Sequence, residues 1–131
     1  MPNTDGKMVL LIDFDGTIHD SDHWSGPTNI DGGPVPEAID WLAELLADER
    51  LEPVIFTTRA ALPEGKIAIR DWLLSKGLPY EPVQNMIITN IKIPCDMIID
   101  DRSWRIAGPG SFPTIRQILA FKPWNKERTV G

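Results

Sequence analysis

Four short apolar runs along the chain have the pattern of buried β-strands, and they cover residues 8–14, 52–58, 86–89 and 96–100. Val, Ile and Leu stand at consecutive positions in these runs, which is typical of strands buried on both faces of a sheet. Apolar residues recur at helical spacing elsewhere. The pattern predicts a helix from Pro36 to residue 46, a second over 63–76 that ends at Gly77, and a third from a Ser111 cap to Pro123, whose inner face carries Ile115, Ile118 and Leu119.

The alternation of strands and helices predicts the fold class. It indicates an α/β protein with a three-layer, doubly wound, Rossmann-like and mostly parallel sheet. The connection 90–95 is too short for a helix, so either it crosses the sheet as an extended strap or the third strand lies nearer to residues 80–84. A length of 131 residues fits a single domain, residues 1–131, with no sizeable cap domain.

Composition and charge narrow the range of partners. The chain carries 13 Lys and Arg against 19 Asp and Glu, and its formal charge of −6 disfavours non-specific binding to nucleic acid or to an anionic membrane. No apolar run approaches the roughly 20 residues of a membrane helix, and the N-terminal MPNTDGK lacks the features of a signal peptide. We therefore expect a cytoplasmic protein without a membrane partner, in which the single cysteine, Cys95, is a small buried residue.

Polar residues follow three of the predicted strands, at the point where each strand ends. Because the carboxyl ends of parallel strands meet at one edge of a sheet, we expect these residues to lie close together. Four neighbouring carboxylates repel one another unless a cation neutralises them, and hard oxygen ligands without His or Cys favour Mg²⁺. The first strand ends in Asp13 and Asp15, the second in Thr57, Thr58 and Arg59, and the fourth in Asp100, Asp101 and Arg102.

These residues resemble the motifs of the haloacid dehalogenase (HAD) superfamily of phosphohydrolases. The pattern D-x-D-G-T, from Asp13 to Thr17, follows an apolar strand directly. VIFTT resembles the second motif, and MIIDD resembles the fourth. The third motif of the family is a single lysine, for which Lys92 is the best-placed candidate because Lys66 and Lys76 lie on a predicted helix. The resemblance covers residues 8–106, in the chain order of the family.

The resemblance implies a role for each motif residue. Asp13 would attack phosphorus and form an aspartyl-phosphate that water hydrolyses, while Asp15 would act as acid and then as base. That double role requires an Asp15 carboxyl poised in its pKa. The implied Mg²⁺ ligands are Asp13, the backbone carbonyl of Asp15 and the side chain of Asp100, with Asp101 binding directly or through water. The implied phosphate-binding residues are Gly16, Thr57, Thr58 and Lys92.

Residues 16–35, which we call the flap, occupy the position after the nucleophile where relatives carry a flap or cap. They are too few for a separate cap domain, so the chain resembles a small capless member. Trp24, the large aromatic residue of this segment, is the candidate for contact with a leaving group, and His19 and His23 lie beside it in the sequence. Arg59 and Arg102 fit either substrate contacts or structural ion pairs with the acidic residues.

The expected activity is hydrolysis of a small phosphorylated substrate, and a nucleic-acid end is the alternative. A non-catalytic HAD-like binding module is a second alternative, disfavoured because every motif residue is present. A receiver-like domain also holds Mg²⁺ with acidic residues. Chain order argues against it, because receivers begin with the acidic pair, whereas here D-x-D leads and Asp100 and Asp101 come late.

Overall fold

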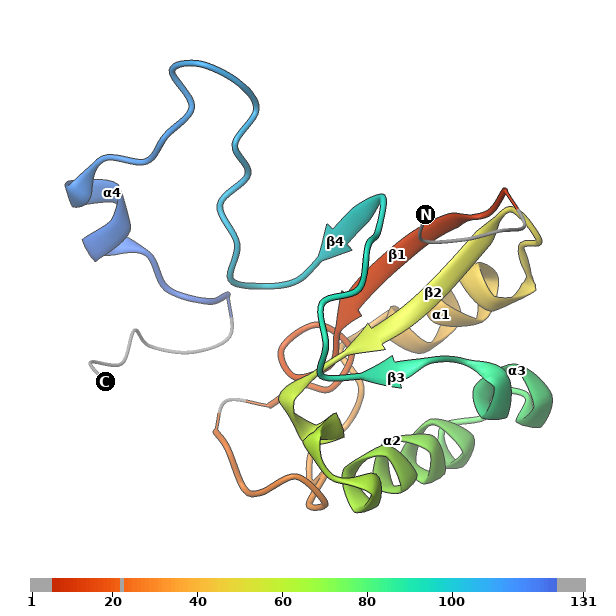
Figure 1. Ribbon diagram of the computed structural model, residues 1–131. Coiled ribbons are helices and arrows are strands. Elements are labelled where there is room, and N and C mark those ends of the chain that lie inside the picture. The colour runs from red at the N-terminus through yellow and green to blue at the C-terminus, as the bar shows by residue number, and fades with distance from the viewer. Residues whose placement is uncertain (1–5, 22, 125–131) are drawn as a thin grey trace.

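A computed structural model describes residues 6–21 and 23–124, and its centre is one parallel sheet with the strand order β3-β2-β1-β4 (Figure 1). The strands are β1 (Met8–Asp13), β2 (Leu51–Phe56), β3 (Ile88–Thr89) and β4 (Met97–Ile99). All three pairings are parallel, and the register places Asp13 opposite Phe56. Strands β1, β3 and β4 lie within the apolar runs that predicted them, and β2 begins one residue before its predicted run.

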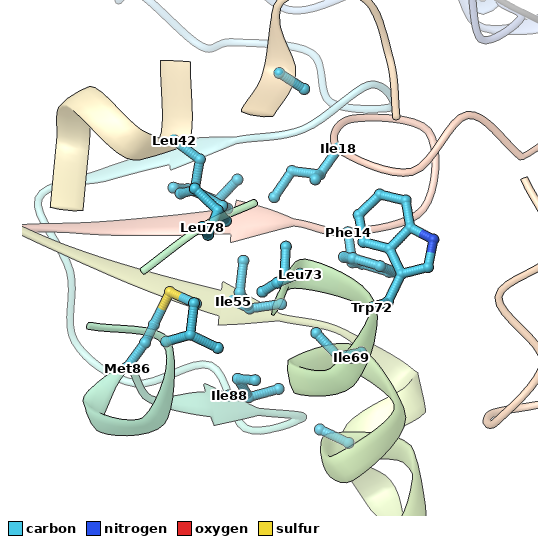
Figure 2. Close-up of a cluster of buried hydrophobic side chains, with 14 of the residues drawn as sticks. Phe14, Ile18, Leu42, Ile55, Ile69, Trp72, Leu73, Leu78, Met86 and Ile88 are labelled. Carbon is cyan, nitrogen blue, oxygen red and sulfur yellow. The ribbon is translucent and has the colours of Figure 1, made fainter. Parts of the chain in front are cut away.

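Three helices pack on one face of this sheet, namely α1 (Ala38–Ala47), α2 (Pro63–Ser75) and α3 (Tyr80–Asn85). Alternate residues of a strand point to opposite faces. Leu10 and Ile12 of β1 point toward Leu42 of α1 and Leu73 of α2, and Figure 2 shows these helices closing over the same core. The predicted spans of the first two helices are confirmed. Because α3 occupies residues 80–85, the alternative place for the third strand is excluded.

The opposite face of the sheet is covered by an extended segment, residues 90–96, which we call the strap. Val9, Leu11 and Val54 form a second small cluster on this face, against Ile93 and the half-buried Cys95 of the strap. The backbone N–H of Asp96 donates to the Val9 carbonyl (2.9 Å), which fixes the strap to β1. The strap carries the chain from β3 across β2 and β1 to β4.

The α/β class with a Rossmann-like parallel sheet is therefore confirmed, and the described part of the chain holds no cap domain. The helices that cover the sheet lie on one face, and the strap takes the place of helices on the other. None of the helices among the described residues has the length and apolar character needed to cross a membrane.

The prediction for the third helix was wrong in its start and in its packing. Helix α4 spans Ile115–Ala120, and Thr114 caps it in a capping box with Gln117. Ser111 lies before the helix, where its hydroxyl donates to the Gly108 carbonyl (2.6 Å) and accepts the N–H of Ala107. The expected inner face is exposed, and Ile115 keeps 76% of its surface. Helix α4 is part of the segment 102–124, which we call the arm. Figure 1 shows this helix apart from the sheet.

Candidate active site

A cavity of about 320 Å³ lies at the carboxyl ends of the strands. The parallel register brings the ends of β1 and β2 to the same level, so the residues that follow them line one space. The sequence analysis missed Asn90, which follows β3 and lines the same cavity. Ligands of parallel sheets bind beyond the carboxyl ends of the strands, and this rule could have identified Asn90. The predicted site residues that line the cavity are Asp13, Asp15, Thr57, Thr58, Asp100, Asp101, Arg102 and Trp24.

Asp13 and Asp101, which both line this cavity, are in hydrogen-bonding contact with one another. The Asp101 side chain is only 2% exposed, and its two oxygens find no hydrogen-bond donor among the described residues other than the Asp13 carboxyl. Burial, reinforced by the hydrogen bond and the negative charge of Asp101, raises the pKa of Asp13 to about 8. The buried Asp101 and the half-buried Asp13 favour sharing a proton or a cation, because ionising two carboxyl groups in contact costs free energy.

Gly16 allows Asp101 to lie this close to the first motif. A Cβ at position 16 would collide with the Asp101 carboxylate, and the φ of +87° at Gly16 also disfavours other residues. The glycine of the D-x-D-G-T pattern is thus required by both backbone conformation and packing, whereas the sequence analysis gave it a place beside phosphate.

Asp100 lines the cavity, but one of its carboxylate oxygens is engaged in the turn, and its role as a metal ligand stays a prediction. Its Oδ1 accepts the backbone N–H groups of Arg102 and Ser103, each at 2.9 Å, and so stabilises the turn after β4. Asp101 is therefore the residue of the acidic pair that faces Asp13. Within residues 6–21 and 23–124, no three His, Cys, Asp or Glu side chains form a ready metal-binding group. The buried Asp101 oxygens and the Asp13 carboxyl nevertheless form a hard-oxygen pair that suits a small divalent cation.

Asp15 is surrounded by hydrogen-bond donors, in contrast to Asp13. Its Oδ1 accepts from His19 Nδ1 (2.8 Å) and Arg59 Nη2 (3.0 Å), and its Oδ2 accepts from Arg59 Nε (2.8 Å). Burial acts to raise the pKa of Asp15, but the hydrogen bonds from His19 and Arg59 outweigh it and hold the pKa below its usual value. Asp15 is thus an oriented carboxylate rather than the carboxyl of poised pKa that the sequence analysis expected.

The two arginines of the candidate site differ in exposure. Arg59 lies in the short 3₁₀ helix η1 (Thr58–Ala61) and is fully buried, so of its two sequence-based interpretations the ion pair is the one that the structure shows. Arg102 remains exposed, with its Nε 3.9 Å from an Asp101 oxygen. It can reach both the acidic pair and a ligand in the cavity. Thr57 precedes η1, and its hydroxyl accepts the N–H of Arg59 (3.2 Å).

Lys92 does not line the cavity that contains Asp13, Asp15 and Asp101. It is exposed on the strap and lines a neighbouring hollow of about 950 Å³, together with Trp104 and Arg105. Asp100 and Ile98 line both spaces, so the hollow adjoins the cavity. The assignment of Lys92 to phosphate binding stays a prediction.

The flap carries Trp24 to the rim of the cavity. The indole keeps 58% of its surface exposed, and its ring centre lies 5.0 Å from the Arg59 guanidinium carbon. His23 also lines the cavity, whereas His19 is buried between Asp15 and the core. Of the three flap residues considered for substrate contact, the structure leaves His23 and Trp24 accessible.

Comparisons with protein-family models, with curated proteins and with solved structures find no match to this chain. A functional assignment therefore depends on the residues of the cavity and on the motifs in which they occur.

Proposed function

We propose that this protein is a Mg²⁺-dependent phosphohydrolase of the HAD type, acting on a phosphomonoester through an aspartyl-phosphate. The observation that carries the proposal is the buried contact of Asp13 with Asp101, in a cavity that Asp15 and Thr57 also line. A buried carboxyl group whose oxygens meet no donor except a second carboxyl costs stability, and Asp101 is such a group. Such a pair is explained when it binds a cation and presents one carboxylate as a nucleophile.

Asp13 and Asp101 would hold the metal ion, and the backbone carbonyl of Asp15 is the further ligand that the HAD resemblance implies. The fit rests on the two Asp101 oxygens, which are buried and otherwise without donors in the described part of the chain. When bound, Mg²⁺ would neutralise the acidic pair and polarise a phosphoryl oxygen. Its charge would also favour the ionised form of Asp13, which is the nucleophilic form.

The chain's own residues would then supply the bond-making steps. An Asp13 oxygen attacks phosphorus, the bond from phosphorus to the leaving oxygen breaks, and the phosphoryl group remains on Asp13. In the second step a water oxygen attacks phosphorus, the bond from phosphorus to the Asp13 oxygen breaks, and inorganic phosphate leaves. Asp15, oriented by Arg59 and His19, accepts the proton of that water. In the first step the same group, once protonated, donates to the leaving oxygen. Thr57 and Thr58 line the cavity where phosphoryl oxygens would lie.

The cavity favours a small phosphorylated substrate. Its rim carries Trp24 and Arg102, an aromatic surface and a cation beside the proposed reaction centre. An acidic protein with one exposed arginine at the rim offers little attraction for a long polyanion. Oligonucleotide ends therefore enter the test as the alternative substrate.

The test is a hydrolysis screen with Mg²⁺ over p-nitrophenyl phosphate, nucleotides, sugar phosphates and oligonucleotides phosphorylated at either end. We expect turnover that Asp13→Asn abolishes, because an amide cannot attack phosphorus. Asp40→Asn, an exposed position on α1, is the matched control and should keep full activity. No turnover on any compound by a Mg²⁺-bound protein would contradict the proposal and favour a binding module.

A further inference from the structure

Arg59 connects the candidate acid and base to the backbone of the flap. Its Nε and Nη2 donate to the two oxygens of Asp15, at 2.8 and 3.0 Å. Its Nη1 donates to the carbonyls of Gly26, Pro27 and Asn29, at 2.9, 3.1 and 3.2 Å. The guanidinium is fully buried, so these carbonyls and Asp15 replace the water that it would otherwise bind.

His19 makes a second connection between the same two parts. Its Nδ1 lies 2.8 Å from Asp15 Oδ1, and its Nε2 accepts the backbone N–H of Gly32 at 2.9 Å. Because Nε2 is an acceptor, Nδ1 carries the hydrogen that is donated to Asp15. Arg59 is therefore bonded to the middle of the flap, and His19, which lies near the start of the flap, is bonded near its end.

Trp24 depends on the same arginine. Its ring lies over the Arg59 guanidinium, and a fixed planar cation is a favourable support for an indole. Removing the guanidinium would take away the partner of this ring and the donor to the carbonyls of residues 26, 27 and 29 together. The placement of Trp24 and the orientation of Asp15 thus share one support.

We propose that Arg59 is a positioning residue that couples the orientation of the Asp15 carboxylate to the placement of the flap and Trp24. The kinetic consequence rests on the proposed phosphohydrolase activity, whereas the structural coupling does not. Through this coupling, a substrate whose leaving group contacts Trp24 meets Asp15 already aimed at its leaving oxygen. A generic aryl phosphate, which needs little protonation to leave, gains less from it.

The experiment compares Arg59→Met and Arg59→Lys with Arg70→Met. Arg70 is the matched control because it donates to one carbonyl, that of Met86 (2.9 Å), and does not line the cavity. One readout is kcat and KM for an alkyl phosphate and for p-nitrophenyl phosphate with Mg²⁺. The other is chymotrypsin cleavage after Trp24, followed by mass spectrometry, which requires no enzymatic activity.

We expect Arg59→Met to lower kcat for the alkyl phosphate about 100-fold, the scale of a displaced general acid. The same variant should lower kcat for p-nitrophenyl phosphate only about tenfold, because this leaving group needs little protonation. Cleavage after Trp24 should accelerate in the same variant. Arg59→Lys should be intermediate in both readouts, because an ammonium restores one donor but not the planar fork. Arg70→Met should change neither readout beyond its effect on thermal stability.

Equal losses on both substrates, or a selective loss without faster cleavage, would overturn the coupling. If Arg59→Met does not fold, Arg59→Lys decides between the outcomes. A wild-type protein that hydrolyses neither substrate would defeat the proposed function, and the cleavage rates would still show whether Arg59 holds the flap. Unchanged cleavage in both Arg59 variants would then show that it does not.

Discussion

The residues of the first motif have opposite electrostatic environments, although only one residue separates them. Asp13 faces another carboxyl, whereas Asp15 receives hydrogen bonds from His19 and Arg59. The sequence could predict that both aspartates end a buried strand, because the apolar run and its stop are local features. It could not predict that Asp101 rather than Asp100 turns inward. That choice depends on the turn after β4, where Arg102 and Ser103 donate to Asp100.

The raised pKa of Asp13 predicts how the stability of the metal-free protein depends on pH. The folded-state pKa of about 8 lies above the ordinary value of 3.8, so the folded state binds more protons between these values. The free energy of unfolding should therefore decrease as the pH rises from about 4 to about 8. Asp15 acts in the opposite direction, but below pH 4, because its pKa is lowered. Urea unfolding between pH 5 and pH 8 with EDTA measures the slope.

Two variants and Mg²⁺ identify the source of this slope. Asp101→Asn should reduce the slope, because the negative charge facing Asp13 is gone while the burial of Asp13 remains, whereas Asp100→Asn should leave it unchanged. Mg²⁺ at 100 times its dissociation constant should add about 2.7 kcal/mol to the stability of the wild type. The gain should be smaller for Asp101→Asn than for Asp100→Asn. The same slope in all three proteins, with no effect of Mg²⁺, would contradict the buried acidic pair.

At the scale of elements, the sequence predicted what local periodicity and termination determine. Apolar runs predicted strands β1 and β2. The end of helix α2 was predicted from Gly77, which has a φ of +99° just after the helix. Helix α4 was predicted with the wrong cap because two capping signals compete within four residues, and the Thr114 to Gln117 box forms instead of a Ser111 cap. Its apolar stripe was taken for a core face, but periodicity alone does not reveal whether a partner element exists.

Helix α2 begins in direct contact with η1, which makes Gly65 sensitive to substitution. A Cβ on Gly65 would collide with the backbone carbonyl of Arg59. Alanine favours helix by up to about 1 kcal/mol, yet forced overpacking costs about 1 to 3 kcal/mol. We therefore expect Gly65→Ala to lower the stability and to disturb the contacts of Arg59. Gly33→Ala is the control, because a Cβ there meets nothing within 4 Å.

Thermal unfolding and turnover of p-nitrophenyl phosphate measure the two effects of Gly65→Ala. The melting temperature should fall relative to Gly33→Ala, and turnover per folded molecule should fall as well. A Gly65→Ala protein as stable and as active as the control would mean that α2 and η1 can separate without consequence for Asp15.

At the scale of the whole molecule, the arm leaves the sheet and returns to the candidate site. It starts at Arg102, directly after the acidic pair, and Nε1 of Trp124 donates to the Gly16 carbonyl (2.8 Å) at its other end. Between these ends, large apolar side chains such as Phe112 and Leu119 are exposed. No local sequence pattern could predict a bond between residues 16 and 124. This bond depends on the complete path of the arm, which passes through α4, apart from the sheet, before it reaches Gly16 (Figure 1).

This return of the arm predicts that a distant tryptophan stabilises the turn beside the nucleophile. In Trp124→Phe the bond to the Gly16 carbonyl is lost, at a cost of about 0.5 to 1.5 kcal/mol, the net value of one hydrogen bond. The N–H of Gly16 bonds to the His19 carbonyl (2.8 Å) across the same turn, so amide hydrogen exchange at residues 16–19 should accelerate. Trp104→Phe is the matched control, since its indole donates to Ser111 within the arm (2.7 Å) and should leave this exchange unchanged. Equal exchange at residues 16–19 in both variants would mean that the arm does not support the turn, and that Gly16 depends only on β1 and the flap.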